Sequence, residues 1–184
     1  HPIEKASSVG AAVFGVDVEI VDSRGLVVAA GEIGHIRYRG PGIAEGFYRD
    51  PDASEASFHD GWFYPGDLGR LDSEGFLYLA GRADDVIIRG GVNIYPAEIE
   101  ETLLNHFLVR DVSVIGIPSV DLGEEIVAFV VAAQEAEQES LIAYCRAHLA
   151  IYKVPKFIEI IDELPKTALG KVVKSDLVSR SRRD

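Results

Sequence analysis

The apolar positions of this chain follow two different rhythms, and the change between them falls near residue 85. From residue 13 to about residue 80, short apolar alternations are separated by turn residues, which is typical of strands and hairpins. After residue 85, strand-like runs alternate with longer segments of helical period. The pattern therefore predicts a β-rich subdomain followed by an α+β domain.

Three strand features of the first half support the β-rich prediction, and one short helix lies between them. An alternating run predicts a strand over 14–21, followed by a turn at 22–25 and a returning strand at 26–28. A second strand is expected over 34–40. Residues 50–56 open like a short capped helix. A hairpin is expected from strands over 62–71 and 76–79, with its turn at 72–75.

The second half carries helix signals between its strands. Pro96 suits the first turn of a helix, and the acidic residues that follow it lie near the positive end of the helix dipole. The remaining elements are a helix and four strands, expected at 138–149 and at 86–88, 112–117, 126–131 and 156–161. This order predicts a small sheet covered by helices.

The junction at 81–85 lacks the apolar content of either neighbour, as an exposed interdomain linker does. We therefore expect a β-subdomain over 1–81, a hinge over 82–85 and a second domain over 86–184.

Composition narrows the function classes. The net charge of -12 argues against a nucleic-acid surface, because such a surface needs clustered positive charge. Basic residues gather only near the end of the chain, where they suit a solvated helix end or a polyanionic small molecule such as CoA. The sequence contains no run of 18 or more apolar residues, so no membrane span is predicted.

The single cysteine and the scattered histidines limit the chemistry further. Cys145 has no partner for a disulfide, which fits a reducing compartment, and we expect a cytoplasmic location. The five histidines show no ligand spacing, so no metal site is predicted. The chain contains no methionine, even at position 1, and we expect it to be a fragment of a longer protein.

Two charged residues before the hinge are candidates for nucleotide binding. Asp67 follows Gly66 in a turn, where a carboxylate can accept the two hydroxyls of a ribose. Arg82 offers a rigid donor fork to ribose or phosphate oxygens. From the pattern alone, however, Asp67 is more often a cap or a solvated acid, and Arg82 more often pairs with a nearby carboxylate.

Two further motifs lie after the hinge. A pair such as Gly90 and Gly91 most often forms only a hairpin turn. The absence of side chains would also let a thin ligand pass close to the backbone. Lys171 follows Gly170 in a loop, where a compact cation can stabilise charge that develops between two anions. As a bare pattern, a single lysine is usually only solvated.

Together, Gly66-Asp67, the stretch from Gly81 to Glu100, and Gly170-Lys171 resemble the adenylate-forming family of acyl- and aryl-CoA synthetases. The resemblance implies that Asp67 holds the ATP ribose and that Arg82 contacts the nucleotide. It also makes Asp84 the hinge residue about which the C-terminal domain turns. Gly90 and Gly91 would line the tunnel for the pantetheine arm of CoA, and Lys171 would be the catalytic lysine. The chain departs from the family pattern at Tyr64-Pro65, His35 and Leu169.

The implied reaction joins a small-molecule carboxylic acid to CoA in two steps, through an acyl-AMP made from ATP. Magnesium is also expected, with its ligands and the Ser/Thr/Gly-rich phosphate loop in a part of the protein outside this sequence. This sequence alone would then be inactive. Two alternatives remain, an adenylation domain of a peptide synthetase and a detached, non-catalytic binding or regulatory module.

Overall fold

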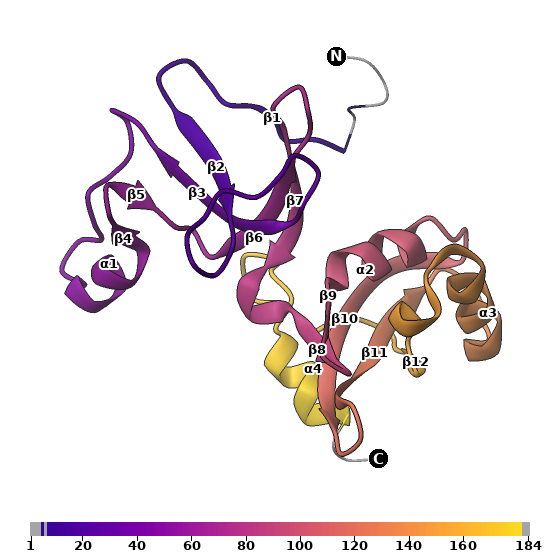
Figure 1. Cartoon of the computed structure of the whole chain (residues 1–184). Coiled ribbons are helices and arrows are strands. Elements are labelled where there is room, and N and C mark those ends of the chain that lie inside the picture. The colour runs from indigo at the N-terminus through magenta and orange to yellow at the C-terminus, as the bar shows by residue number, and fades with distance from the viewer. Residues whose placement is uncertain (1–4, 6, 182–184) are drawn as a thin grey trace. The chain divides into compact units, whose positions relative to one another are not determined.

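Antiparallel strand pairing dominates the first part of the chain in the computed structural model, which describes residue 5 and residues 7–181 (Figure 1). The chain divides into two compact units, His1–Asp84 and Asp85–Asp184. The first unit contains β1 (Gly10–Ala11), β2 (Asp17–Val21), β3 (Gly34–Arg39), α1 (Pro51–Ser57), β4 (Phe58–His59), β5 (Trp62–Phe63), β6 (Asp67–Leu71), β7 (Phe76–Arg82) and the first residues of the 3-10 turn η2 (Ala83–Asp85).

The strands of the first unit form a seven-stranded sheet in the order β1-β7-β6-β3-β5-β4, with β2 paired to β3. Its small core contains Ile20, Ile36 and Leu68, which are each at most 6% exposed. Gly69 lies in β6, where an added Cβ would come within 2.7 Å of the Tyr78 carbonyl oxygen. Glycine at this position therefore allows β6 to pack closely against β7.

Two expectations for this unit need correction. Residues 62–71 are not one strand, because Pro65 has no N–H to donate and Gly66 adopts a φ of 80°, so β5 ends before β6 begins. Residues 26–28 form only an isolated bridge, between Val21 and Val27. The short helix is confirmed as α1, and the side chain of Asp50 caps it by accepting a hydrogen bond from the Ala53 N–H at 3.1 Å.

The second unit is a five-stranded sheet with helices on both faces. Its elements are β8 (Ile87–Arg89), β9 (Val92–Ile94), α2 (Pro96–Leu104), β10 (Val109–Ser119), β11 (Gly123–Ala132), α3 (Gln138–His148), the 3-10 turn η3 (Ile151–Lys153), β12 (Phe157–Ile160) and α4 (Lys174–Ser181). The strand order is β10-β11-β8-β9. β12 pairs with β11 in parallel, and the other pairings are antiparallel.

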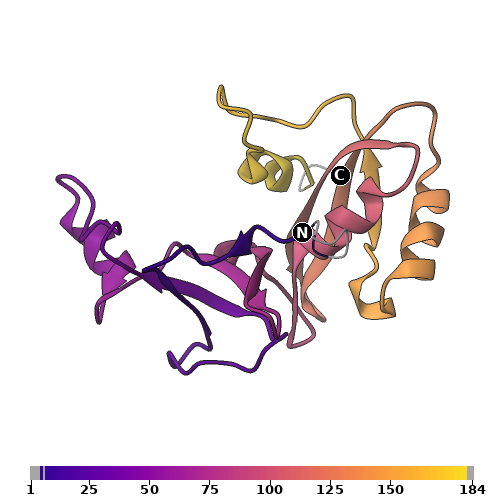
Figure 2. The ribbon, with the colours of Figure 1, turned by 90° about the horizontal axis from the view of Figure 1, so that it is seen from above.

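Strand β11 shows why both faces need a cover, since it is a continuous apolar run from Ile126 to Val131. Alternate residues of this run join two separate cores. One core includes Leu103 of α2 and Leu141 of α3, and the other includes Leu177 of α4. Figure 2 shows α4 on one side of the strands and α2 and α3 on the other. The predicted α+β domain is confirmed. None of the helices in the described residues is long and apolar enough to cross a membrane.

Candidate functional site

Asp67 and Arg82 are brought together by strand pairing in the first unit. They are directly opposite each other in the antiparallel ladder of β6 and β7. Arg82 Nη1 donates to Asp67 Oδ1 at 3.0 Å and to the Pro65 carbonyl oxygen at 2.8 Å. Both side chains remain accessible, Arg82 at 47% and Asp67 at 35% exposed. The pair is therefore held in place with its remaining polar atoms open to a ligand.

The turn before Asp67 is shaped around the guanidinium group. Gly66 has a φ of 80°, and an added Cβ there would lie 2.9 Å from Arg82 Nη2. The Gly66 carbonyl oxygen also accepts a hydrogen bond from the Ala83 N–H at 2.9 Å. A side chain at residue 66 would thus be both strained and crowded, so glycine here serves the packing of Arg82.

Asp84 lies in η2, which follows β7, and its side chain is exposed. It forms no ion pair with any described residue, whereas Asp85, the next residue, lies 3.0 Å from Lys174. Asp84 is thus placed where the chain leaves the first unit.

Gly90 and Gly91 connect β8 to β9 as a two-residue turn, because Arg89 and Val92 are register partners. Their φ values are 59° and 82°, the left-handed pair that this hairpin type requires. An added Cβ at Gly91 would meet nothing within 4 Å, so the backbone shape and not space demands glycine there. The turn presents bare backbone at the end of a hairpin.

Lys171 lies in a tight turn over residues 166–172, which we call the Lys171 turn. An isolated bridge between Lys166 and Val172 closes it. Thr167 stabilises it twice, because its N–H donates to the Lys171 carbonyl oxygen at 2.8 Å and its Oγ1 accepts from the Lys171 N–H at 3.2 Å. The Lys171 side chain is exposed and forms no ion pair with the residues that the structure describes. The ammonium group is therefore available on a well-defined loop.

The sequence reasoning missed the group that anchors the end of β8. Arg89 hydrogen-bonds to the carboxylate of Glu125 and donates to the Tyr152 carbonyl oxygen at 2.9 Å, and Lys156 lies 3.5 Å from the same carboxylate. Burial alone would raise the pKa of Glu125, but the hydrogen bond and charge of Arg89 hold that pKa below its ordinary value. The sequence does contain a signal for this group, because an acid such as Glu125 next to a long apolar strand indicates a buried carboxylate that needs a partner.

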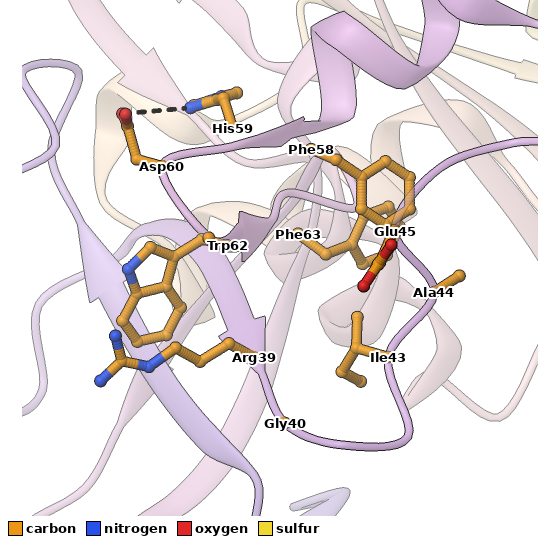
Figure 3. Close-up of a pocket in the computed structure, with 11 residues that line it drawn as sticks. Arg39, Gly40, Ile43, Ala44, Glu45, Phe58, His59, Asp60, Trp62 and Phe63 are labelled. Carbon is orange, nitrogen blue, oxygen red and sulfur yellow. Dashed lines mark ion pairs between the residues drawn. The ribbon is translucent and has the colours of Figure 1, made fainter.

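A separate cavity of about 390 Å³ lies in the first unit, and no predicted site residue lines it (Figure 3). The Arg39 guanidinium stacks on the Trp62 ring with 4.3 Å to the centroid and also pairs with Asp17 at 2.9 Å. His59 Nδ1 lies 3.7 Å from Asp60 Oδ2, a contact drawn dashed in Figure 3. Because Arg39 is already paired and the cavity lies apart from every predicted site residue, we assign no ligand to it.

The described residues contain no cluster of three or more His, Cys, Asp or Glu side chains that could hold a metal ion. What the chain does present is a paired aspartate and arginine, a bare glycine turn and an exposed lysine on a fixed turn. Taken one by one, the aspartate and arginine can bond polar ligand oxygens, and the ammonium group can stabilise negative charge.

Comparison with known proteins identifies this class of protein. Residues 98–171 match the family model of the AMP-binding enzyme C-terminal domain. A 2-succinylbenzoate–CoA ligase of Listeria monocytogenes serovar 1/2a is 43% identical over 97% of this chain and 36% of its own length. A long-chain-fatty-acid–CoA ligase of Salmonella typhimurium is 38% identical over 99% of this chain and 33% of its own length.

Solved structures agree with the sequence matches. An o-succinylbenzoate CoA synthetase from Bacillus subtilis, in complex with its acyl-adenylate intermediate, superposes with a TM-score of 0.90. It is 38% identical, and the match covers 95% of this chain and 36% of that one. The chain therefore belongs to the adenylate-forming family of AMP-binding enzymes. It corresponds to the C-terminal portion of these acyl- and aryl-CoA ligases and spans about a third of the length of the curated relatives it matches.

Proposed function

We propose that the protein to which this sequence belongs is an AMP-forming acyl-CoA synthetase, which joins a carboxylic acid to CoA at the expense of ATP. The observation that carries the proposal is the exposed Lys171 on its fixed turn, at the end of the stretch that matches the AMP-binding enzyme C-terminal domain. Relatives named as CoA ligases of a succinylbenzoate and of long fatty acids support it.

In the first step a carboxylate oxygen attacks the α-phosphorus of ATP. A new bond forms between this oxygen and the α-phosphorus. The bond between the α-phosphorus and the oxygen that bridges it to the β-phosphorus breaks, and pyrophosphate leaves with the bonding electrons. Two anions must approach each other in this step, and negative charge develops between them. A cation placed there lowers the barrier. We assign that role to the Lys171 ammonium group, which no carboxylate of the described residues neutralises.

Asp67 and Arg82 are proposed to bind the nucleotide. The Asp67 carboxylate has one oxygen held by Arg82 and a second that can accept from ribose hydroxyls. Arg82 uses Nη1 to donate to Asp67 and to the Pro65 carbonyl oxygen, and its other N–H donors remain for the nucleotide. The shared hydrogen bond fixes both groups before the ligand binds, which reduces the entropy lost on binding.

In the second step the CoA sulfur attacks the acyl carbon, the C–O bond to the phosphate breaks, AMP leaves, and the thiol proton is released. Gly90 and Gly91 are proposed to line the path of the pantetheine arm, since their turn exposes backbone without side chains. Asp84 is proposed as the residue about which the C-terminal unit turns between the two steps.

Two further parts of the proposal concern the whole protein. Magnesium would neutralise the phosphates of ATP, and its ligands are proposed to lie outside this sequence. A cytoplasmic location is proposed from Cys145, the single cysteine, which is a free and buried thiol.

The test is a pyrophosphate-release screen of the longer protein that carries this sequence, against a panel of aliphatic and aromatic acids. Acid-dependent release that yields an acyl-CoA is expected. Release with transfer to a carrier-protein thiol but not to CoA would identify a peptide-synthetase adenylation domain, and no release with any acid would favour a non-catalytic module. The 184-residue chain alone, as the control, is expected to release none.

A further inference from the structure

Lys174, the first residue of α4, lies between two carboxylates from different elements of the second unit. Its ammonium nitrogen is 3.0 Å from Asp85 Oδ2, in η2, and 4.0 Å from Glu100 Oε1, in α2. The three side chains are only 24–33% exposed, so water screens their interaction less than that of a surface pair. Neither the strand pattern nor the family motifs pointed to this group.

The acidic side of the group is held by the backbone. Glu100 Oε1 accepts the Val114 N–H of β10 at 2.8 Å. Burial raises the pKa of Glu100, and the carboxylates of Asp85 and Asp111 raise it as well, whereas the Val114 hydrogen bond and the charge of Lys174 act in the opposite direction. The pKa of Glu100 is raised overall, and Lys174 is the cation that lies against both carboxylates.

Both ends of the Lys171 turn are tied by ion pairs to other elements. At the first residue of the turn, Lys166 pairs with Asp111 of β10 at 2.6 Å. After it, the chain reaches Lys174 only three residues beyond Lys171. Helix α4 then continues to Leu177, which is 1% exposed in the core on its own face of the sheet. The position of Lys171 is thus set from both sides, and the second tie runs to the residue after Asp84.

We propose that Lys174 is a positioning residue, and that its ion pair with Asp85 ties the Lys171 turn to the hinge. The proposal rests on the function proposed above. Because Asp85 follows Asp84 directly, a change of backbone angles at Asp84 acts on Asp85 and, through the ion pair, on the start of α4. Lys174 would act through Lys171 and not on the substrate itself.

Amide hydrogen exchange in the 184-residue chain tests the tie without any substrate. In Asp85→Asn and in Lys174→Met, the amides of Thr167, Gly170 and Lys171 should exchange about tenfold faster, as expected when one charge-assisted interaction that holds a segment is lost. Lys174→Arg keeps the charge and should retain most of the protection. Arg180→Met is the matched control, since it removes the ion pair of α4 with Glu159 and leaves Lys174 in place. Unchanged exchange in both Asp85→Asn and Lys174→Met would overturn the proposal.

The half-reactions of the longer protein separate positioning from simple stabilisation. Asp85→Asn and Lys174→Met should slow acid-dependent pyrophosphate release about tenfold and leave thioester formation from a synthetic acyl-adenylate near the wild-type rate. An equal fall in both half-reactions would indicate a structural role and refute positioning. A wild-type protein that releases no pyrophosphate would refute the proposed function instead, and the exchange experiment would still decide whether the tie exists.

Discussion

Arg82 Nη1 bridges the Asp67 carboxylate and the Pro65 carbonyl oxygen, at 3.0 and 2.8 Å, across the ladder of β6 and β7. The pairing joins residues that are fifteen positions apart. It reconciles the two interpretations of Arg82, as a salt-bridge residue and as a nucleotide-binding residue. The guanidinium does form the salt bridge expected of an ordinary surface arginine, but its partner is the other candidate nucleotide residue. The structural pair is thus also the pair that we propose to bind the nucleotide.

Replacement of Arg82 by lysine should weaken nucleotide binding. A single ammonium group cannot bond Asp67, Pro65 and a ligand with the fixed fork of a guanidinium group. In the longer protein, KM for ATP should rise about tenfold, with a smaller change in kcat, because the lost contact serves binding in both the ground state and the transition state. Arg39→Lys is the control, since Arg39 also pairs with an aspartate but lies outside the proposed site. An unchanged KM in Arg82→Lys would remove Arg82 from nucleotide binding.

Gly91→Ala should slow thioester formation more than adenylation. The added methyl group meets nothing within 4 Å, but a φ of 82° costs an alanine about 1–2 kcal/mol, so the turn must shift. Gly75→Ala provides a matched control, because Gly75 has a φ of 81° in the turn before β7 and also has open space around it. Both variants should lose similar stability. If both also lose the same thioester activity, the glycine turn has no role in the second step.

Ser113→Ala should leave the protein as stable or stabilise it by up to about 1 kcal/mol, since a buried polar group without a partner costs free energy. Ser113 is 2% exposed, and its Oγ has no hydrogen-bond partner among the described residues. Ser8→Ala is the contrast, because it removes a hydrogen bond to the Leu77 carbonyl oxygen and should destabilise. Urea unfolding measures both, and a clear loss of stability in Ser113→Ala would show that this hydroxyl is satisfied in solution.

Cys145 should be inert to thiol reagents while the protein is folded. Cys145 lies on the buried face of α3, and burial raises the pKa of its thiol to about 11 from its ordinary value of 9.0. The folded state thus favours the neutral thiol. This preference is fully present below pH 9 and is lost as the pH rises through 11, so stability should fall over that window. Alkylation by iodoacetamide at pH 8 should require unfolding. Fast alkylation of the folded chain would contradict the buried placement.

The fold was largely readable from the sequence, because most elements carry a local signal. The run from Ile126 to Val131 is long and apolar enough to mark a strand that is buried on both faces. The extent of the hairpin of β10 and β11 was underestimated, since its outer residues, such as Pro118 and Glu124, carry no apolar pattern. The sequence predicts one strand over 62–71, whereas the structure has β5 and β6, because the break at Pro65 depends on a turn and not on periodicity.

The site residues were named through their motifs, but their partners were not. The bond between Arg82 and Asp67 follows from the register of β6 and β7, which no local pattern specifies. In the same way, Lys174, Asp85 and Glu100 meet only because α4 packs against the strand that follows α2. Long-range packing thus decided which charges pair, and single-sequence patterns do not contain that information.

The most direct test of the central claim is to measure the two half-reactions of the longer protein with Lys171→Ala. Because Lys171 is proposed to stabilise charge only in the first step, acid-dependent pyrophosphate release should fall by about a hundredfold or more, as when an electrostatic group is removed from a transition state. Thioester formation from synthetic acyl-adenylate should continue near the wild-type rate. Arg146→Ala, an exposed cation on α3, should change neither rate. Unchanged pyrophosphate release in Lys171→Ala would contradict the account.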